Sequence, residues 1–383
     1  MLAARLLVVI LLAHAAMASG TEPAAAEPAA SSRQRVDAVV TPHVEKKQIV
    51  GAMVGLLKVD GTSEFFSYGV TKAEGPAPTA DTIFEIGSIS KTFTALLLAQ
   101  LVDQKQAQLS DPARTLLPDD WQPPKRGERE ITLVELATHT SGLPENPPNL
   151  MRDLALNPKL QLDPFARFDE RQLRSAMAEL KLKDQTAPPV AYSNLGMGLL
   201  GEALAHKTGK SYDELVRAWI AEPLQMQSTF VVPSAQQLLQ SATGHVADGA
   251  AVPYWSFATL AGAGAVRSNA NDMLNYLAAQ CGQTDTPLRS AMDLTQQKRA
   301  PAFGVMHIGL GWFIRKYKGH DIWWHNGGTN GFTSFAAFTR DPNVAVVVLC
   351  NSGPGDSAEG MAVDLIGDKL MRQLVDDAAP AAR

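Results

Sequence analysis

The segment Phe84-Glu85-Ile86-Gly87-Ser88-Ile89-Ser90-Lys91 contains the only Ser-x-x-Lys sequence of the chain. If a helix begins at or near Ser88, residues three apart share one face, so the Lys91 amine can lie beside the Ser88 hydroxyl. A lysine that desolvation has deprotonated can accept the hydroxyl proton and make the serine a nucleophile. Backbone N–H groups at the helix start would stabilise an oxyanion, and Gly87 would permit a tight turn. The alternative is a helix cap by Ser88 or Ser90 with a solvated Lys91.

Tyr192-Ser193-Asn194 is the only Tyr-x-Asn sequence, and it directly precedes a helical pattern that begins at Leu195. A phenol beside one or two cations can ionise and shuttle a proton. The Asn194 amide offers donors and an acceptor, so it could hold Lys91 and a substrate carbonyl together. The alternative is a buried tyrosine with Asn194 near a helix start.

A glycine-rich passage at 324–332 leads into a strand-like run at 333–339. Glycines at a strand edge allow a substrate backbone to approach closely enough to form hydrogen bonds. His325 could bind a substrate carboxylate when protonated, or donate a hydrogen bond when neutral. The alternative is an ordinary turn before an edge strand.

These three motifs occur in the order and approximate spacing found in penicillin-recognising serine enzymes. The chain resembles the class C β-lactamase family, which also includes D-Ala-D-Ala carboxypeptidases, penicillin-binding proteins and esterases. The octet at 84–91 is similar to the nucleophile signature of that family at every position. Further likeness comes from Leu136-Ala137-Thr138-His139-Thr140-Ser141-Gly142-Leu143-Pro144, from Glu222-Pro223-Leu224 and from Gly309-Leu310-Gly311-Trp312.

The resemblance implies chemical roles at the matched positions. Ser88 would attack the substrate carbonyl, while Lys91 and Tyr192 would move the proton. Asn194 would orient Lys91 and the substrate amide. The backbone N–H groups of Ser88 and Gly328 would form the oxyanion hole.

The resemblance also implies a substrate-binding set. Asn146 falls where the family carries an amide that recognises the acyl side chain of the substrate. The substrate-binding residues would be Asn146, His325, Asn326, Gly327 and Gly328. Neither a metal nor another cofactor is implied.

Two positions depart from the family pattern. His325-Asn326-Gly327 replaces the Lys-Thr-Gly of true class C β-lactamases, so the permanent cation facing the drug carboxylate is lost. His-x-Gly is similar to the version of this motif found in some D,D-peptidases of the family. Lys207-Thr208-Gly209 is not the missing motif, because it follows Tyr192 by only 15 residues and matches a helix C-terminus closed by glycine. The run 262–268 has glycine where β-lactamases usually carry an aromatic residue. Both changes lower the expected rate of β-lactam turnover and leave the acylation chemistry intact.

Helices and strands predicted from apolar periodicity must position these motifs. Helical spacing covers 33–47, 92–104, 195–206, 272–280 and 358–375, and strand-like runs cover 51–59, 64–70, 311–315, 333–339 and 344–349. Asp60-Gly61 predicts a hairpin between the first two strands. The economical architecture is α/β (α+β): one antiparallel sheet built from both chain ends and flanked by helices, plus a central helical lobe. The resemblance identifies it as a β-lactamase/transpeptidase-like fold.

We expect a single hydrolase domain over 33–383. Its α/β lobe would comprise 33–90 and 286–383, and its helical lobe would comprise 91–285. A substrate cleft would lie between the two lobes.

Composition narrows the possible functions. The chain has 45% hydrophobic and 19% charged residues among 383, which is typical of a globular protein. Its formal net charge of -5 provides no basic field to bind a nucleic-acid backbone. Cys281 and Cys350 offer neither a CxxC pair nor zinc-ligand spacing, and the sequence leaves open whether they form a disulfide.

The first 18 residues predict a cleaved secretory signal peptide. Arg5 precedes an apolar run at 6–13, and Ala16-Met17-Ala18 provides a small-x-small cleavage pattern. The alternative is an uncleaved anchor, but this run is shorter than the roughly 20 residues that a membrane span needs. Residues 19–32 would be a flexible leader. We therefore expect a secreted or periplasmic protein without stable membrane insertion.

The sequence thus predicts an exported serine hydrolase that forms an acyl-enzyme and most readily fits a β-lactamase. A D-alanyl-D-alanine peptidase is the next hypothesis, and a carboxylesterase the third. A catalytically idle peptidoglycan-binding module is the alternative outside enzymes, although a pure binder has no need of an activated nucleophile. The expected partner is a small β-lactam or a peptidoglycan stem peptide, and we expect a monomer.

Overall fold

The computed structural model describes residues 31–355 and 361–378. The predicted signal peptide and the leader up to residue 30 lie outside the described residues. Helix α1 (Ser32–Glu45) begins after its N-cap Ser31, whose hydroxyl accepts a hydrogen bond from the Gln34 amide. The helix therefore starts at the last position of the expected leader.

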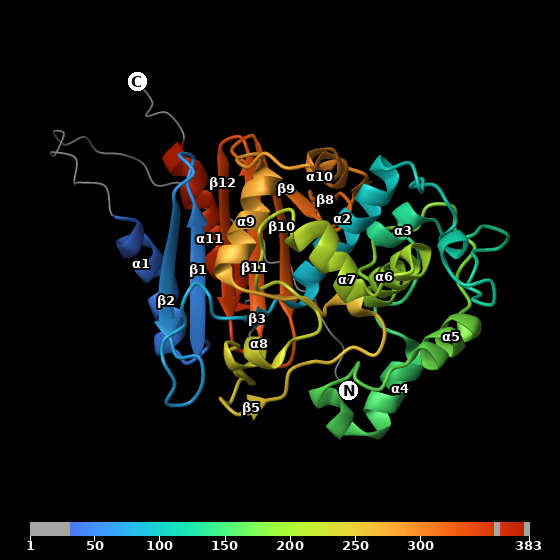
Figure 1. The fold of residues 1–383 in the computed structure, drawn as a ribbon, viewed down its shortest axis with the longest axis horizontal. Coiled ribbons are helices and arrows are strands. Elements are labelled where there is room, and N and C mark those ends of the chain that lie inside the picture. Colours follow the sequence, from blue (N-terminus) through green and yellow to red (C-terminus); the bar gives the residue numbers. More distant parts are fainter. Residues whose placement is uncertain (1–30, 356–360, 379–383) are drawn as a thin grey trace, which may run out of the picture.

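An eight-stranded antiparallel sheet joins the two ends of the chain (Figure 1). Its strand order is β2-β1-β12-β11-β10-β9-β8-β7. β1 pairs with β12, which places Val54 opposite Val348. Both the predicted architecture and the hairpin at Asp60-Gly61 are confirmed. The strands are β1 (Gly51–Leu57), β2 (Ser63–Gly69), β7 (Ala300–Pro301), β8 (His307–Ile308), β9 (Phe313–Tyr317), β10 (His320–Gly328), β11 (Thr333–Arg340) and β12 (Asn343–Cys350).

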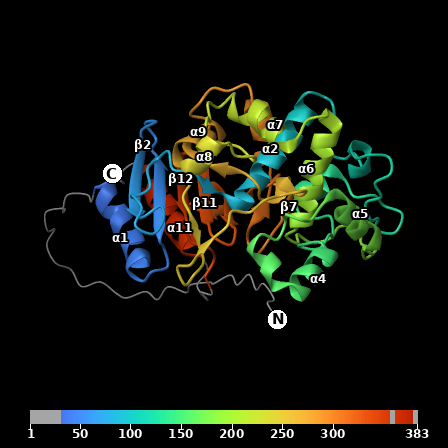
Figure 2. The ribbon, with the colours of Figure 1, turned by 60° about the horizontal axis from the view of Figure 1, so that its bottom comes forward.

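Helices cover both faces of this sheet, which explains why β12 is apolar from residue 344 to its end. Alternate residues of β12 belong to two separate cores. One core lies under α11 (Ala362–Ala378) and α1, and the other lies under α9 (Ala270–Cys281), on opposite sides of the sheet (Figure 2). Helix α9 falls within 91–285 in sequence, yet it packs against β1, β11 and β12.

Helix α2 (Ser90–Asp103) carries Lys91 in its first turn. Every residue from Ser90 to Leu101 is buried, so this part of α2 has no solvent face. It contacts α6 (Asn194–Thr208), α7 (Tyr212–Val216) and α10 (Arg289–Gln296). The other helices are α3 (Leu133–Ala137), α4 (Pro148–Leu156), α5 (Glu170–Glu179) and α8 (Ala235–Leu239).

The remaining elements of the structure are short. Two-stranded ladders pair β3 (Phe84–Glu85) with β6 (Arg267–Ser268) and β4 (Gly244–His245) with β5 (Ala251–Val252). Single turns of 3-10 helix occur at η1 (Gly87–Ile89), η2 (Ala113–Leu116), η3 (Pro158–Leu162) and η5 (Ala261–Ala263), and a π-helical turn at η4 (Arg217–Ala221).

The interpretation of 324–332 as a turn before an edge strand is wrong. Residues His320–Gly328 form strand β10, and the turn lies after it, where the Thr329 amide donates to the Phe332 carbonyl. β11 is an interior strand between β10 and β12. Glycines and polar residues disfavour strand formation locally, and the pairing of residues 323–328 with β11 stabilises β10 here.

Cys281 and Cys350 are separate buried thiols, so no disulfide joins them. Among the described helices, none combines the length and the apolar character that crossing a bilayer requires.

Candidate active site

Ser88 and Lys91 meet at the junction of η1 and α2. Gly87 has a φ of +49°, a conformation that favours glycine and turns the chain from β3 into η1. The Lys91 ammonium donates to the Ser88 hydroxyl at 2.9 Å and to the Ala263 carbonyl at 2.6 Å. Ser88 lies in a 3-10 turn rather than in the α-helix itself, but the three-residue spacing still brings the two side chains together.

Burial sets the protonation of Lys91. Its side chain is 0% exposed, and the described structure gives it no carboxylate ion pair. Desolvation lowers the pKa of Lys91 to about 7, against the opposing influence of the Glu145 carboxylate. Close to neutral pH, a large fraction of Lys91 is therefore a neutral amine able to accept the Ser88 proton.

Tyr192 and Asn194 reach the same place from the start of α6. The Ser193 hydroxyl caps that helix by accepting from the Gly196 amide at 2.9 Å. The Lys91 ammonium lies 4.8 Å from the centre of the Tyr192 ring. Burial raises the pKa of the Tyr192 phenol, while a hydrogen bond with Ser88 acts in the opposite direction. Tyr192 is therefore a proton donor at neutral pH rather than the ionised phenolate considered from the sequence.

Asn194 and Asn146 form an amide pair at the cleft. Asn194 Nδ2 donates to Asn146 Oδ1 at 3.0 Å. Both side chains line the cleft that contains Ser88. The Lys91 ammonium bonds to Ser88 and Ala263 and not to Asn194, so the predicted contact between Asn194 and Lys91 is not made here.

His325 lies beside the site but does not line the cleft. Its ring is 0% exposed, and its centre lies 6.2 Å from that of Tyr192. Nδ1 is 2.5 Å from the Asn326 carbonyl, which can only accept, so Nδ1 carries the proton. Burial, reinforced by Lys91, lowers the pKa of His325 to about 3. A cationic His325 that binds a substrate carboxylate is therefore disfavoured.

The glycines of β10 bring two backbone amides together. A Cβ on Gly327 would lie 2.1 Å from the Ile86 carbonyl oxygen and 2.9 Å from the Ser88 nitrogen. A Cβ on Gly87 would lie 2.6 Å from the Gly328 nitrogen. Only glycine permits this approach, which places the Ser88 and Gly328 amides beside each other. Two adjacent N–H groups at a nucleophilic hydroxyl can stabilise an oxyanion.

The Asn326 side chain lies on the opposite face of β10. Side chains alternate along a strand, so Asn326 points away from the face that His325 and Gly327 share. Its Nδ2 donates to both carboxylate oxygens of Asp364 in α11, each at 3.0 Å. Burial raises the pKa of Asp364 to about 7. The structure therefore does not bring the Asn326 side chain to Ser88.

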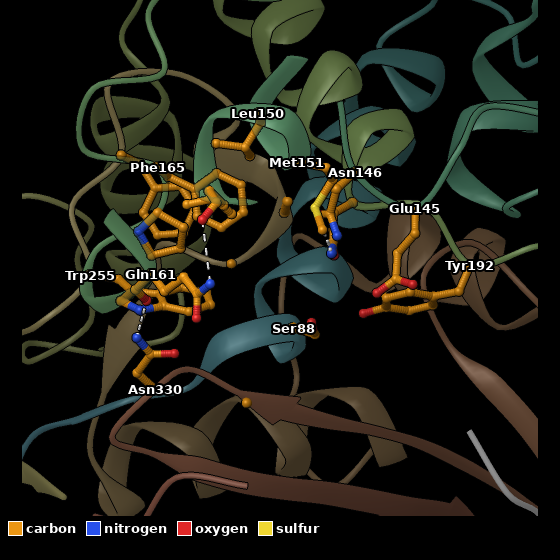
Figure 3. Close-up of a pocket in the computed structure, with 17 residues that line it drawn as sticks. Ser88, Glu145, Asn146, Leu150, Met151, Gln161, Phe165, Tyr192, Trp255 and Asn330 are labelled. Atoms are coloured by element: carbon orange, nitrogen blue, oxygen red, sulfur yellow. Dashed lines mark hydrogen bonds between the residues drawn. The ribbon is translucent and has the colours of Figure 1, made fainter. Parts of the chain in front are cut away.

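The cleft has a volume of about 390 Å³ and two chemically different sides (Figure 3). Aromatic residues form one side: Phe165 stacks on Phe257 at 4.8 Å and meets Trp255 edge-on at 5.4 Å. Tyr192 and Glu145 lie on the other side of Ser88. Sequence reasoning missed the aromatic wall, because its members come from separate loops. The Phe257 ring lies 3.5 Å from where a Gly264 Cβ would be, so an aromatic side chain borders the glycine-containing run 262–268.

Glu85 connects two segments that border the cleft. Its carboxylate accepts from the Trp255 amide at 2.7 Å and from the Thr329 hydroxyl at 2.8 Å. It is 4% exposed and lies 3.5 Å from Arg267, and burial raises its pKa to about 7. Glu85 thus ties the aromatic wall to the turn after β10.

Comparisons with known proteins show which family this chain is similar to. A family model described as "Beta-lactamase" matches residues 36–369. The D-alanyl-D-alanine-carboxypeptidase/endopeptidase AmpH of Escherichia coli (strain K12) is 30% identical over 340 residues, covering 82% of this chain and 85% of that protein. A β-lactamase of Pseudomonas fluorescens is 26% identical over 360 residues, covering 83% and 93%.

Solved structures share the fold. A β-lactamase from Sulfitobacter sp. EE-36 superposes with a TM-score of 0.74 at 24% identity, covering 91% of this chain and 99% of that one. A β-lactamase/D-alanine carboxypeptidase from Pseudomonas syringae gives 0.74 at 22% identity, with the same coverage. With the family model spanning most of the chain, the protein belongs to the β-lactamase family of serine hydrolases.

Proposed function

We propose that this chain is exported and hydrolyses β-lactams through an acyl-enzyme at Ser88. The observation that carries the proposal is the 2.9 Å hydrogen bond between Ser88 and a fully buried Lys91. A buried lysine without a carboxylate ion pair is costly to keep, and its lowered pKa suits it to activate a hydroxyl. Several relatives are named as β-lactamases, which supports β-lactams as the substrate class.

Acylation begins when neutral Lys91 accepts the Ser88 proton. The Ser88 oxygen then attacks the lactam carbonyl, and the oxyanion accepts hydrogen bonds from the Ser88 and Gly328 amides. As the C–N bond breaks, the Tyr192 hydroxyl donates its proton to the departing nitrogen and is reprotonated from Lys91. Water then hydrolyses the Ser88 ester and regenerates the enzyme.

A D-alanyl-D-alanine peptidase is the second candidate. The specific observation in its favour is the 30% identity to a protein named D-alanyl-D-alanine-carboxypeptidase/endopeptidase. Replacement of the usual lysine by a neutral His325 also favours it over rapid β-lactam turnover. Both candidates share acylation at Ser88 and differ in how fast water removes the acyl group.

Burst kinetics with a chromogenic cephalosporin separate these candidates. We expect sustained turnover that is lost in Ser88→Ala. A stoichiometric burst that stalls, together with cleavage of a D-Ala-D-Ala peptide, would assign the peptidase function instead. Turnover confined to a short-chain p-nitrophenyl ester would indicate an esterase. No labelling by a fluorescent penicillin and no turnover of any of these would favour a peptidoglycan-binding module.

Export is tested independently of activity. We expect the chain secreted by a Gram-negative host to begin at Ser19, as measured by N-terminal sequencing of the periplasmic fraction. An intact N-terminus in the membrane fraction would contradict the proposed cleavage.

A further inference from the structure

Glu145 is the one charged residue among the described residues that line the cleft. The other lining residues are apolar, amide or hydroxyl side chains and glycines, and Lys91 lies beneath them, fully buried. Glu145 itself is exposed. A single carboxylate therefore sets the charge that a bound substrate meets.

The main chain of Glu145 is held firmly in place. Its carbonyl accepts hydrogen bonds from the Asn194 amide at 2.8 Å and the Leu195 amide at 3.1 Å, at the start of α6. By contrast, no hydrogen bond or ion pair to the Glu145 carboxylate is found within residues 31–355 and 361–378. A fixed backbone thus presents a carboxylate that is free to bind a substrate cation.

The Glu145 carboxylate lies on the Tyr192 side of Ser88 (Figure 3). Its negative charge opposes the lowering of the Lys91 pKa by burial and adds to the raising of the Tyr192 pKa by burial, as expected of a carboxylate beside these proton-transfer groups. Phe165 and Trp255 of the aromatic wall lie on the other side of Ser88, and Phe257 stacks on Phe165.

Proton transfer identifies which part of a substrate faces Glu145. The departing atom must receive a proton, so it leaves on the side where Tyr192 and Lys91 lie. The acyl portion then extends toward the aromatic wall. Glu145 consequently faces the leaving portion of the substrate.

We propose that Glu145 is a specificity-determining residue that favours substrates with a positive charge on the leaving side of the scissile bond. This inference rests on the proposed acylation at Ser88. For a cephalosporin, the favoured substrates carry a cationic substituent at C3, on the ring that contains the departing nitrogen. Attraction between the exposed carboxylate and such a cation should raise the acylation rate constant by about three- to fivefold.

A matched pair of cephalosporins tests the proposal. Both carry the same thienylacetyl acyl group and the same ring carboxylate, and they differ only at C3, where one has an acetoxymethyl group and the other a pyridiniummethyl group. The second-order rate constant of acylation, followed by loss of β-lactam absorbance, is measured for each. This constant is accessible even where deacylation is slow. Ser88→Ala provides the background.

We expect Glu145→Gln to bring the ratio of pyridinium to acetoxy rates down by about three- to fivefold relative to the unmodified chain. Glu45→Gln is the control, because Glu45 is an exposed carboxylate at the end of α1 and the change in net charge is the same. That variant should keep the original ratio. Raising the salt concentration should shrink the ratio of the unmodified chain toward that of Glu145→Gln.

The outcomes distinguish the inference from the proposed function. An unchanged ratio in Glu145→Gln would overturn the inference while leaving acylation at Ser88 in place. Equal slowing or acceleration of both substrates is one form of this outcome, because a charge that acts only through Lys91 and Tyr192 affects both alike. Acylation of neither substrate above the Ser88→Ala background would remove the proposed function and the inference with it.

Discussion

The pH dependence of acylation follows from the burial of Lys91. Only the neutral amine accepts the Ser88 proton, and burial lowers the pKa of Lys91 to about 7. The neutral fraction is then about one tenth at pH 6, one half at pH 7 and nine tenths at pH 8. The acylation rate constant should therefore rise about tenfold between pH 6 and pH 8 and level off above pH 8.

Two variants link this profile to Lys91. In Lys91→Arg the side chain stays protonated across the whole range, so acylation should fall by about 10²- to 10⁴-fold. In Glu145→Gln the charge that raises the Lys91 pKa is removed, so the midpoint should move to lower pH. The assay is stopped-flow acylation by a β-lactam in buffers of constant ionic strength. A profile that is flat between pH 6 and pH 8, or one whose midpoint lies near pH 10, would refute the reasoning.

Three further predictions concern stability, proton donation and the oxyanion site. Lys91→Met should raise the free energy of unfolding at pH 7 by on the order of 4 kcal/mol, because it removes a buried amine whose pKa is lowered to about 7. Between about pH 7 and 10.5 the unfolded unmodified chain binds more protons than the folded one, so this gain should fade as pH rises. Urea unfolding at pH 7 and pH 10 measures the trend. Tyr192→Phe should slow acylation by at least about tenfold, and an unchanged rate would remove Tyr192 from the mechanism. Gly327→Ala should displace the Ser88 amide and reduce acylation by about 100-fold. Gly355→Ala should retain the rate, because its Cβ would meet no atom of the described residues within 4 Å; equal rates in the two variants would argue against the oxyanion site.

Local spacing explains why the centre of the site was predictable. Ser88 and Lys91 are three residues apart, and any helical turn places them on one face. Tyr192 and Asn194 stand at the start of α6, where the helical pattern marks a boundary. The sheet was equally accessible, because β1, β11 and β12 are apolar runs with clear turn signals around them.

Contacts between distant segments explain what the sequence did not reveal. The Ala263 carbonyl binds Lys91 through a main-chain oxygen, which no residue pattern encodes. Phe165 and Trp255 meet in the cleft from separate loops. The orientation of the Asn326 side chain depends on β10 being a strand. The glycine-rich sequence of this part of β10 does not predict a strand, which forms through pairing with β11.

The most direct test of the central claim is the location of the covalent intermediate. The purified chain is incubated with a slowly hydrolysed β-lactam, quenched in acid and mapped by peptide mass spectrometry. Ser90→Ala serves as the control, because Ser90 is fully buried and its hydroxyl accepts from the Val266 amide at 3.0 Å. We predict one adduct with the mass of the intact β-lactam on Ser88, retained in Ser90→Ala and absent in Ser88→Ala. An adduct that persists in Ser88→Ala, or the absence of any adduct on the unmodified chain, would contradict the account.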